Sequence, residues 1–128
     1  MENFYEIHSC QKTKFRVYLN FSNPEVVKKF NIINRSEKLL TKFILVIEAV
    51  KKGVSNKTQF NWEASSPLGE VFAIKVSEHR FYTVQSSNAG YRDLYICRYG
   101  KKQSQSNSKK LTKIIESIDK INIQKLLT

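Results

Sequence analysis

Hydrophobic and polar residues alternate along several short segments of the chain, and this period of two predicts β-strands. The clearest case is the segment KFRVYLNF, residues 14–21, whose apolar side chains share one face while its polar side chains share the other. Similar patterns predict strands over residues 70–76, 79–84 and 93–99. Because a very short turn separates residues 70–76 from 79–84, these two strands are expected to pair as a hairpin.

Three other segments carry apolar residues at every third or fourth position, which predicts amphipathic α-helices. The first helix is expected to begin at residues 22–25, SNPE, which combine a capping-box pattern with a proline suited to a first turn. The second is expected to begin after Ser36 and to end at Gly53, because serine caps helix starts and glycine ends many helices. The third covers residues 108–121, with Ser108 as its cap.

The order of these elements predicts an α+β fold. The intervening residues 53–69 are expected to form a loop, in which Phe60 and Trp62 either anchor the loop on the core or offer a base-stacking platform. The predicted order is therefore β-α-α-β-β-β-α: an antiparallel-rich sheet of about four strands, an N-terminal helical hairpin on one face and a C-terminal helix. We expect a single domain over residues 13–128, preceded by an N-terminal extension of residues 1–12.

Length and composition narrow the class of protein. The 128 residues suit one domain, and no apolar run approaches the ~18 residues that a membrane span needs. Residues 1–12 lack the features of a secretory signal, so a cytoplasmic location without a membrane partner is expected. Cys10 and Cys97 are too few for a disulfide framework. With His8 and His79 they could supply four zinc ligands, but only one pair is closely spaced, so neither a metal site nor a cofactor is predicted.

The charge of the chain is strongly positive. Its 22 basic and 11 acidic residues leave a net charge of +11, which attracts polyanions. In the segment RYGKKQSQSNSKK, residues 98–110, the aromatic end of a predicted strand is followed by four lysines and six polar residues that build no core. A generic lysine-rich, solubilising surface is the alternative interpretation of this excess.

The strand patterns place basic and aromatic side chains on the sheet face opposite the helical hairpin. The first strand directs its polar side chains there, and Lys75, Arg80 and Tyr82 have the matching parity in the hairpin. Lys101 and Lys102 leave the last strand at its end. We expect a groove in which lysines attract phosphates while rings stack on bases. The residues expected to contact RNA are Lys14, Arg16, Tyr18, Tyr82, Tyr99, Lys101, Lys109 and Lys110.

Three segments, taken in order, resemble the RelE/HigB-type toxins of bacterial toxin–antitoxin pairs, especially the phage-derived HigB-like branch. Residues 23–53 resemble the helical hairpin of that branch, with a Pro-Val-x-x-Phe-like start and a Leu/Ile-rich helix that ends in glycine. Residues 68–84, LGEVFAIKVSEHRFYTV, resemble its hairpin, and residues 94–118 resemble its last strand, its Lys-Lys turn and its closing helix. The resemblance covers residues 14–121, and no single motif within it is diagnostic.

The resemblance implies an mRNA interferase that cuts mRNA, usually on the ribosome, through attack of the ribose 2′-hydroxyl on the adjacent phosphate without a metal. Lys75 and Arg80 stand where the family has arginines, and Lys101 and Lys102 match its Lys-Lys pair. The implied catalytic residues are Lys75 for proton transfer and Arg80 and Lys102 for holding the phosphate. The implied partners are mRNA, the ribosome and a cognate antitoxin protein.

The chain departs from the family at one catalytic position. Members often place a tyrosine near the start of the last helix, where this chain has Asn107 and Ser108. Tyr99, Tyr82 and His79 are the substitutes nearby, and histidine alone of these titrates near neutral pH. Two other functions therefore stay open: a non-catalytic RNA- or ribosome-binding module, and a protein whose charge serves acidic protein partners.

Overall fold

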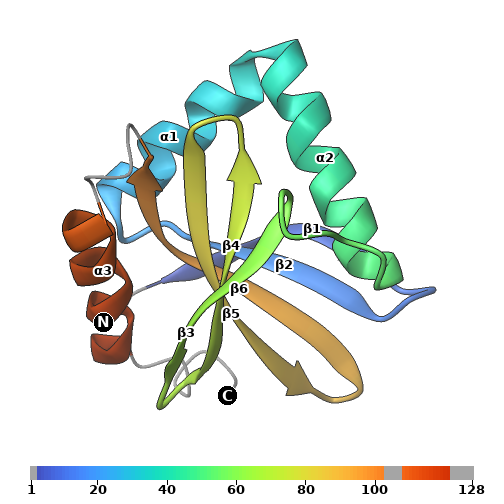
Figure 1. Cartoon of the computed structure of the whole chain (residues 1–128). Coiled ribbons are helices and arrows are strands. Elements are labelled where there is room, and N and C mark those ends of the chain that lie inside the picture. The colour runs from blue at the N-terminus through green and yellow to red at the C-terminus, as the bar shows by residue number, and fades with distance from the viewer. Residues whose placement is uncertain (1–2, 103–107, 122–128) are drawn as a thin grey trace.

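The computed structural model describes residues 3–102 and 108–121, which form one six-stranded sheet with helices on both faces (Figure 1). The elements in chain order are β1 (Phe4–Cys10), β2 (Phe15–Asn20), α1 (Pro24–Arg35), α2 (Glu37–Lys52), β3 (Phe60–Ser66), β4 (Gly69–Val76), β5 (His79–Asn88), β6 (Tyr91–Lys101), α3 (Ser108–Glu116) and the 3-10 helix η2 (Ser117–Lys120).

The sheet is mixed, with the strand order β1-β2-β6-β5-β4-β3. Strands β3 to β6 form a continuous antiparallel meander, and β1 pairs antiparallel with β2. The two parts join through β2 and β6, which run parallel with Phe15 opposite Arg92 and Leu19 opposite Ile96. A parallel pair needs a long crossover, and here the chain from α1 to β5 supplies it.

The fold predicted from the sequence is wrong in its strand number and order. The four strands expected from alternation are present as β2, β4, β5 and β6, but the sheet has six strands and begins with two of them before the first helix. The additional strands are β1, within residues 1–12, and β3, within the segment expected to be a loop. Both additional strands lie at the edges of the sheet.

Each additional strand contains a β-bulge, which interrupts the regular change of face along the strand. In β1 the register shifts between Glu6 and His8, so the consecutive residues Ile7 and His8 both lie on the side of helices α1 and α2. In β3 the register shifts between Trp62 and Ala64, so Phe60 packs on one face of the sheet and Ala64 on the other, although an even number of positions separates them. A bulge inserts one extra residue and reverses the parity of the positions that follow it.

The helix ends follow local chemistry. Ser36 Oγ accepts a hydrogen bond from Leu39 N at 3.3 Å at the start of α2, and Gly53 ends that helix in the left-handed conformation at φ 72°, which confirms both predictions. At the start of α1 the predicted cap is displaced by one residue. Asn23, rather than Ser22, accepts the hydrogen bond from Val26 N at 3.0 Å. Proline occupies the first turn as predicted.

One hydrophobic core fills the space between the sheet and helices α1 and α2. Val26 and Ile33 of α1, together with Phe43 of α2, pack against the buried side chains Phe15 and Phe81 of the sheet. Burying side chains of this size contributes roughly 1.5–3 kcal/mol each. This core holds both helices on one face.

A second hydrophobic core covers the opposite face, so the prediction of an open, ring-lined groove there is wrong. The apolar side of α3 and η2, including Leu111, Ile114 and Ile118, packs against Tyr82 and Tyr95 of the sheet. An amphipathic helix must bury its apolar stripe, and this face is where α3 does so. Gly100 permits the close approach, because a Cβ atom at this position would lie 2.6 Å from Leu111 Cδ2.

We expect Ile118→Ala to lower the free energy of unfolding by about 2–4 kcal/mol, since Ile118 is fully buried in this second core. The matched control is Ile32→Ala on α1, where the side chain is 40% exposed and the loss should stay below about 1 kcal/mol. Urea unfolding followed by circular dichroism measures both. Equal losses in the two variants would contradict the packing of α3 on the sheet.

Candidate nucleic-acid interface

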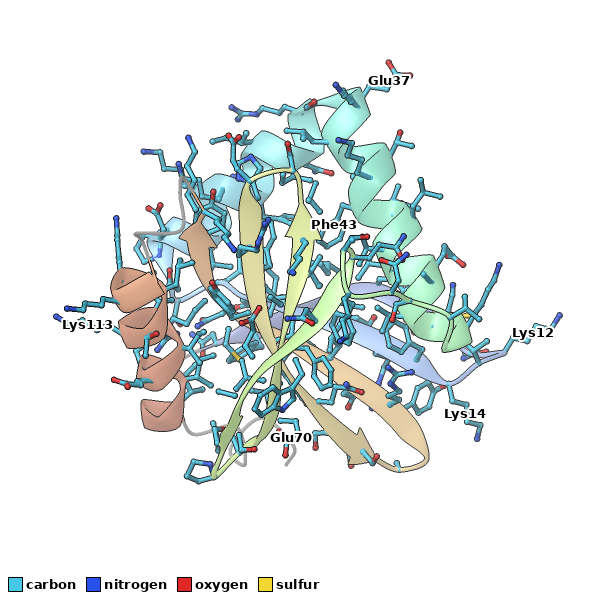
Figure 2. The ribbon with its side chains drawn as sticks, viewed as in Figure 1. Lys12, Lys14, Glu37, Phe43, Glu70 and Lys113 are labelled. Atoms are coloured by element: carbon cyan, nitrogen blue, oxygen red, sulfur yellow. The ribbon has the colours of Figure 1, made fainter. Side chains whose placement is uncertain are left out.

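The residues expected to contact RNA do not share one surface. Figure 2 shows Lys14, beside β2, on the opposite side of the molecule from Lys113 of α3, the helix that also carries the predicted residues Lys109 and Lys110. Lys14 precedes β2, whereas Lys101 ends β6, a strand that runs parallel to β2 and pairs with it near its own start. The predicted set therefore divides into a β2 group and a group at the far end of β6.

The β2 group is engaged in internal contacts. Arg16 donates two hydrogen bonds to the buried carboxylate of Asp93, from Nε to Oδ1 at 2.7 Å and from Nη2 to Oδ2 at 2.9 Å. Its guanidinium also lies 4.1 Å from the centre of the Tyr91 ring. Tyr18 stacks on Tyr95 with ring centres 5.0 Å apart. These contacts give Arg16 and Tyr18 structural roles in the sheet.

Tyr82 cannot stack on a base in this structure. Its side chain is 2% exposed and lies in the second hydrophobic core beneath α3. Burial is the main cause that raises the pKa of Tyr82 to about 12. The alternation of residues along the strand predicted the face of the sheet to which this ring points. It did not predict that α3 covers that face.

The three predicted catalytic residues do lie close together. Lys75 of β4 pairs directly with Arg80 of β5 beside their turn, and the Lys102 backbone N donates to Glu78 O at 2.9 Å in that turn. Burial lowers the pKa of Lys75 and the charge of Arg80 lowers it further, while Glu63 opposes these effects and Lys102 adds a smaller lowering. Arg80 Nη1 also donates to Ser77 O at 2.6 Å, which orients the guanidinium. We call Lys75, Arg80 and Lys102 the hairpin cations.

A cleft of about 350 Å³ opens at the end of β6, between α1 and α3, and we call it the strand-end cleft. It contains three residues predicted to bind RNA, namely Tyr99, Lys101 and Lys110. It also contains Glu25 and Lys29 of α1, which the sequence reasoning missed. The remaining lining residues are Gly100 and Ile114.

One sequence signal for the missed residues existed. Glu25 and Lys29 are four positions apart, so they share one face of α1. The sequence alone did not show that this face meets the end of β6, because that contact depends on how the first core seats the helix. The two residues become part of a site only in the folded chain.

Tyr99, which lines the strand-end cleft, and its hydrogen-bond partner His79 are uncharged at neutral pH. Tyr99 Oη and His79 Nδ1 lie 2.5 Å apart in a hydrogen bond. Burial raises the pKa of Tyr99 to about 12 and, as the largest cause, lowers the pKa of His79. The charges of the cleft therefore come from its other lining residues, among which Lys29 Nζ lies 5.6 Å from the centre of the Tyr99 ring.

Lys101 retains the capacity to bind an anion. Its ammonium group lies 3.6 Å from the Glu78 carboxylate, but both side chains are more than two-fifths exposed. An exposed pair of this kind is weak and is readily exchanged for a phosphate contact. Lys109 differs from Lys110, since it lies with Lys113 and Glu116 along a shallow surface of α3 outside the strand-end cleft.

The structure offers no obvious metal centre. Within residues 3–102 and 108–121, no three His, Cys, Asp or Glu side chains gather closely enough to hold a metal ion. Cys10 lies on the edge strand β1, while Cys97 is buried in the second core.

Asn107, at the position where the toxin family often has tyrosine, lies outside the described residues. No helix in the described part of the chain combines the length and apolar character needed to cross a membrane.

Comparison of the chain with models of known protein families, with curated proteins and with solved structures finds no match. The assignment of a function therefore depends on the geometry and charge of the two basic sites described above.

We expect Arg16→Ala to lower the free energy of unfolding by about 3–5 kcal/mol, because it leaves the Asp93 carboxylate, 1% exposed, without its counter-charge. The control is Lys51→Ala, which breaks the pair with the more exposed Glu48 and should cost at most about 1 kcal/mol. Adding Asp93→Asn to Arg16→Ala should restore part of the loss. Urea titration measures all three, and an Arg16→Ala loss no larger than that of the control would refute the structural role.

Proposed function

We propose that this protein binds single-stranded RNA at the end of β6, through the strand-end cleft and the adjacent hairpin cations. The observation that carries the proposal is the convergence of Lys29, Lys101 and Lys110 on one cleft from α1, β6 and α3. Three cations, with Glu25 in the lining and only the exposed Glu78 carboxylate beside Lys101, leave a net positive charge that attracts an anion. A phosphate chain is such an anion.

The hairpin cations extend this positive surface past the end of β6. Lys101 and Lys102 are consecutive, and consecutive residues of an extended chain point to opposite sides. Lys101 thus contributes to the cleft on the α1 side, while Lys102 interacts with Lys75 on the other side. A single strand crossing the end of β6 would meet both groups.

The expected binding is dominated by phosphate contacts. Tyr82 is buried and Tyr99 is 5% exposed, so neither ring offers a broad platform for a base. Phosphate contacts position a nucleic acid without reading its sequence, and they weaken steeply with salt. We therefore expect low sequence preference. The proposal places the protein in the cytoplasm, with mRNA and the ribosome as its partners.

The test is the salt dependence of binding to a fluorescently labelled single-stranded RNA. In the triple variant Lys29→Ala/Lys101→Ala/Lys110→Ala, we expect weaker binding and a log–log salt slope reduced by about 2, at about 0.7 per lost contact. Fluorescence anisotropy at several salt concentrations gives both quantities.

The matched control is Lys38→Ala/Lys42→Ala/Lys57→Ala, which removes the same charge from exposed positions on and after α2. An equal loss of affinity in this control would show non-specific attraction and contradict the cleft. Tighter binding of polyglutamate than of RNA at equal charge would instead favour an acidic protein partner.

A second candidate function is an mRNA interferase, the toxin of a toxin–antitoxin pair. It is supported by the resemblance of the sequence to that family and by the lowered pKa of Lys75 beside Arg80 and Lys102. Attack by the 2′-hydroxyl on the adjacent phosphate forms a 2′,3′-cyclic phosphate and breaks the bond to the 5′-oxygen of the next nucleotide. This step needs a group that takes the hydroxyl proton, cations that stabilise the phosphorane, and a proton for the leaving 5′-oxygen. In this proposal Lys75 moves the proton, Arg80 and Lys102 hold the phosphate, and a cognate antitoxin covers these cations.

Primer extension on cellular mRNA after induced expression separates the two functions. For an interferase we expect discrete new 5′ ends and growth arrest, both lost in Arg80→Ala and in Lys102→Ala, since removing one charge-stabilising group costs about 10²–10³ in rate. Circular dichroism verifies that the variants fold. Intact mRNA in cells where the protein remains bound to ribosomes would exclude the interferase function. Binding without cleavage would then be the one remaining function of the two.

A further inference from the structure

The strand-end cleft contains a carboxylate among its lysines. Of the described residues that line it, Glu25 of α1 is the one acidic residue, beside Lys29, Lys101 and Lys110. A carboxylate repels a phosphate chain and therefore weakens its binding. The attraction of phosphates alone does not account for an acid at this place, so Glu25 needs either a structural role or a partner on the ligand.

The Glu25 carboxylate is unpaired in the described part of the chain. Glu25 and Lys29 are four positions apart on α1, a spacing at which glutamate and lysine often pair. Lys29 Nζ lies over the Tyr99 ring, 5.6 Å from its centre, and the Glu25 side chain forms no ion pair and accepts no hydrogen bond among the described residues. Burial raises the pKa of Tyr99 most and the charge of Glu25 is the next cause, so the carboxylate also lies near this residue. A cation and an unused acceptor therefore lie beside the same tyrosine.

The ligand must supply the donor, because an ionised carboxylate only accepts hydrogen bonds. In an RNA strand the ribose 2′-hydroxyl is a donor on the carbon next to the one that carries the 3′-phosphate, and DNA lacks it. The amino groups of the bases are also donors, but they lie beyond the sugar, and a cleft of about 350 Å³ is at the lower end of the range for ligand pockets. The 2′-hydroxyl is therefore the donor that best fits beside a phosphate held by the lysines.

We propose that Glu25 selects RNA over DNA in the strand-end cleft by accepting a hydrogen bond from a ribose 2′-hydroxyl while the lysines hold the adjacent phosphate. The inference rests on the proposed binding of RNA at this cleft, and it adds the residue that distinguishes ribose from deoxyribose. The charge of Glu25 weakens the binding of every nucleic acid, and RNA alone recovers the loss through the hydrogen bond. The same carboxylate thus favours one ligand and disfavours its competitor.

The alternative role of Glu25 is structural. It lies in the first turn of α1, where the helix dipole favours a negative charge. That role makes no difference between RNA and DNA. Glu37 has the same place in α2, is likewise exposed, and lies at a corner of the molecule distant from α3 (Figure 2). It is the matched control, because its removal takes a first-turn charge from a helix and leaves the cleft unchanged.

The probes are three oligouridylates of equal length: RNA, its 2′-deoxy form and its 2′-fluoro form. Uracil has no amino group, and the 2′-fluoro form keeps the sugar pucker of RNA without the donor. In fluorescence anisotropy we expect the RNA to bind about tenfold more tightly than either other form, as for one hydrogen bond to a charged group. Equal affinities for all three would overturn this inference and leave RNA binding intact, whereas no binding of any probe would overturn both. Equal affinities for RNA and the 2′-fluoro form would assign the preference to sugar pucker and also overturn it.

Two variants assign the preference to Glu25. In Glu25→Ala the ratio of RNA affinity to DNA affinity should fall to about one, and the 2′-deoxy form should bind more tightly than to the unaltered protein, because a repelling charge is gone. Glu25→Gln keeps an oxygen that accepts, so its ratio should be intermediate. Glu37→Ala should keep the full ratio, and circular dichroism verifies that all three variants fold. A ratio that survives in Glu25→Ala, or falls equally in Glu37→Ala, would overturn the role of Glu25.

Discussion

The burial of β6 on both faces and along both edges is the constraint on which the rest of the structure depends. The strand pairs with β2 on one side and β5 on the other. Its Leu94 and Ile96 belong to the core under α1 and α2, while Tyr95 and Cys97 belong to the core under α3. A strand held in this way has little freedom, so the direction in which its end leaves the sheet is determined by two layers of packing.

This constraint confines the accessible cations of the strand to its end. Basic groups inside the sheet need internal partners, and Arg16 on Asp93 is the example. Lys101 and Lys102, at the end of β6, need no such buried partner. They lie beside residues from α1, α3 and the β4–β5 turn. The candidate interface is thus a meeting point of elements that are distant in sequence, and its shape follows from the packing of the two cores.

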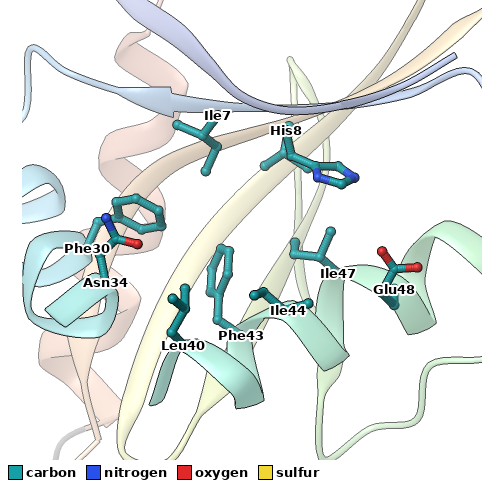
Figure 3. Close-up of a pocket in the computed structure, with 10 residues that line it drawn as sticks. Ile7, His8, Phe30, Asn34, Leu40, Phe43, Ile44, Ile47 and Glu48 are labelled. Carbon is teal, nitrogen blue, oxygen red and sulfur yellow. The ribbon is translucent and has the colours of Figure 1, made fainter. Parts of the chain in front are cut away.

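The strand-end cleft and the pocket between β1 and helices α1 and α2 differ in chemistry. The strand-end cleft is lined by Lys29, Lys101 and Lys110 beside an uncharged Tyr99, which suits an extended anion. The pocket of about 320 Å³ between β1 and the two helices has mainly apolar walls (Figure 3). Helix α1 contributes a polar side chain to each, Lys29 to the first and Asn34 to the second.

The sequence by itself determined the features that depend on neighbouring residues: the strands β2, β4, β5 and β6, and the ends of α2 at Ser36 and Gly53. It also brought Lys75 and Arg80 together, because a short hairpin sets their register. Only the tertiary structure decided the bulged edge strands, the burial of Tyr82 under α3 and the entry of Lys29 into the cleft. Alternation and helical spacing report which side of an element is apolar, whereas long-range packing decides what that side meets.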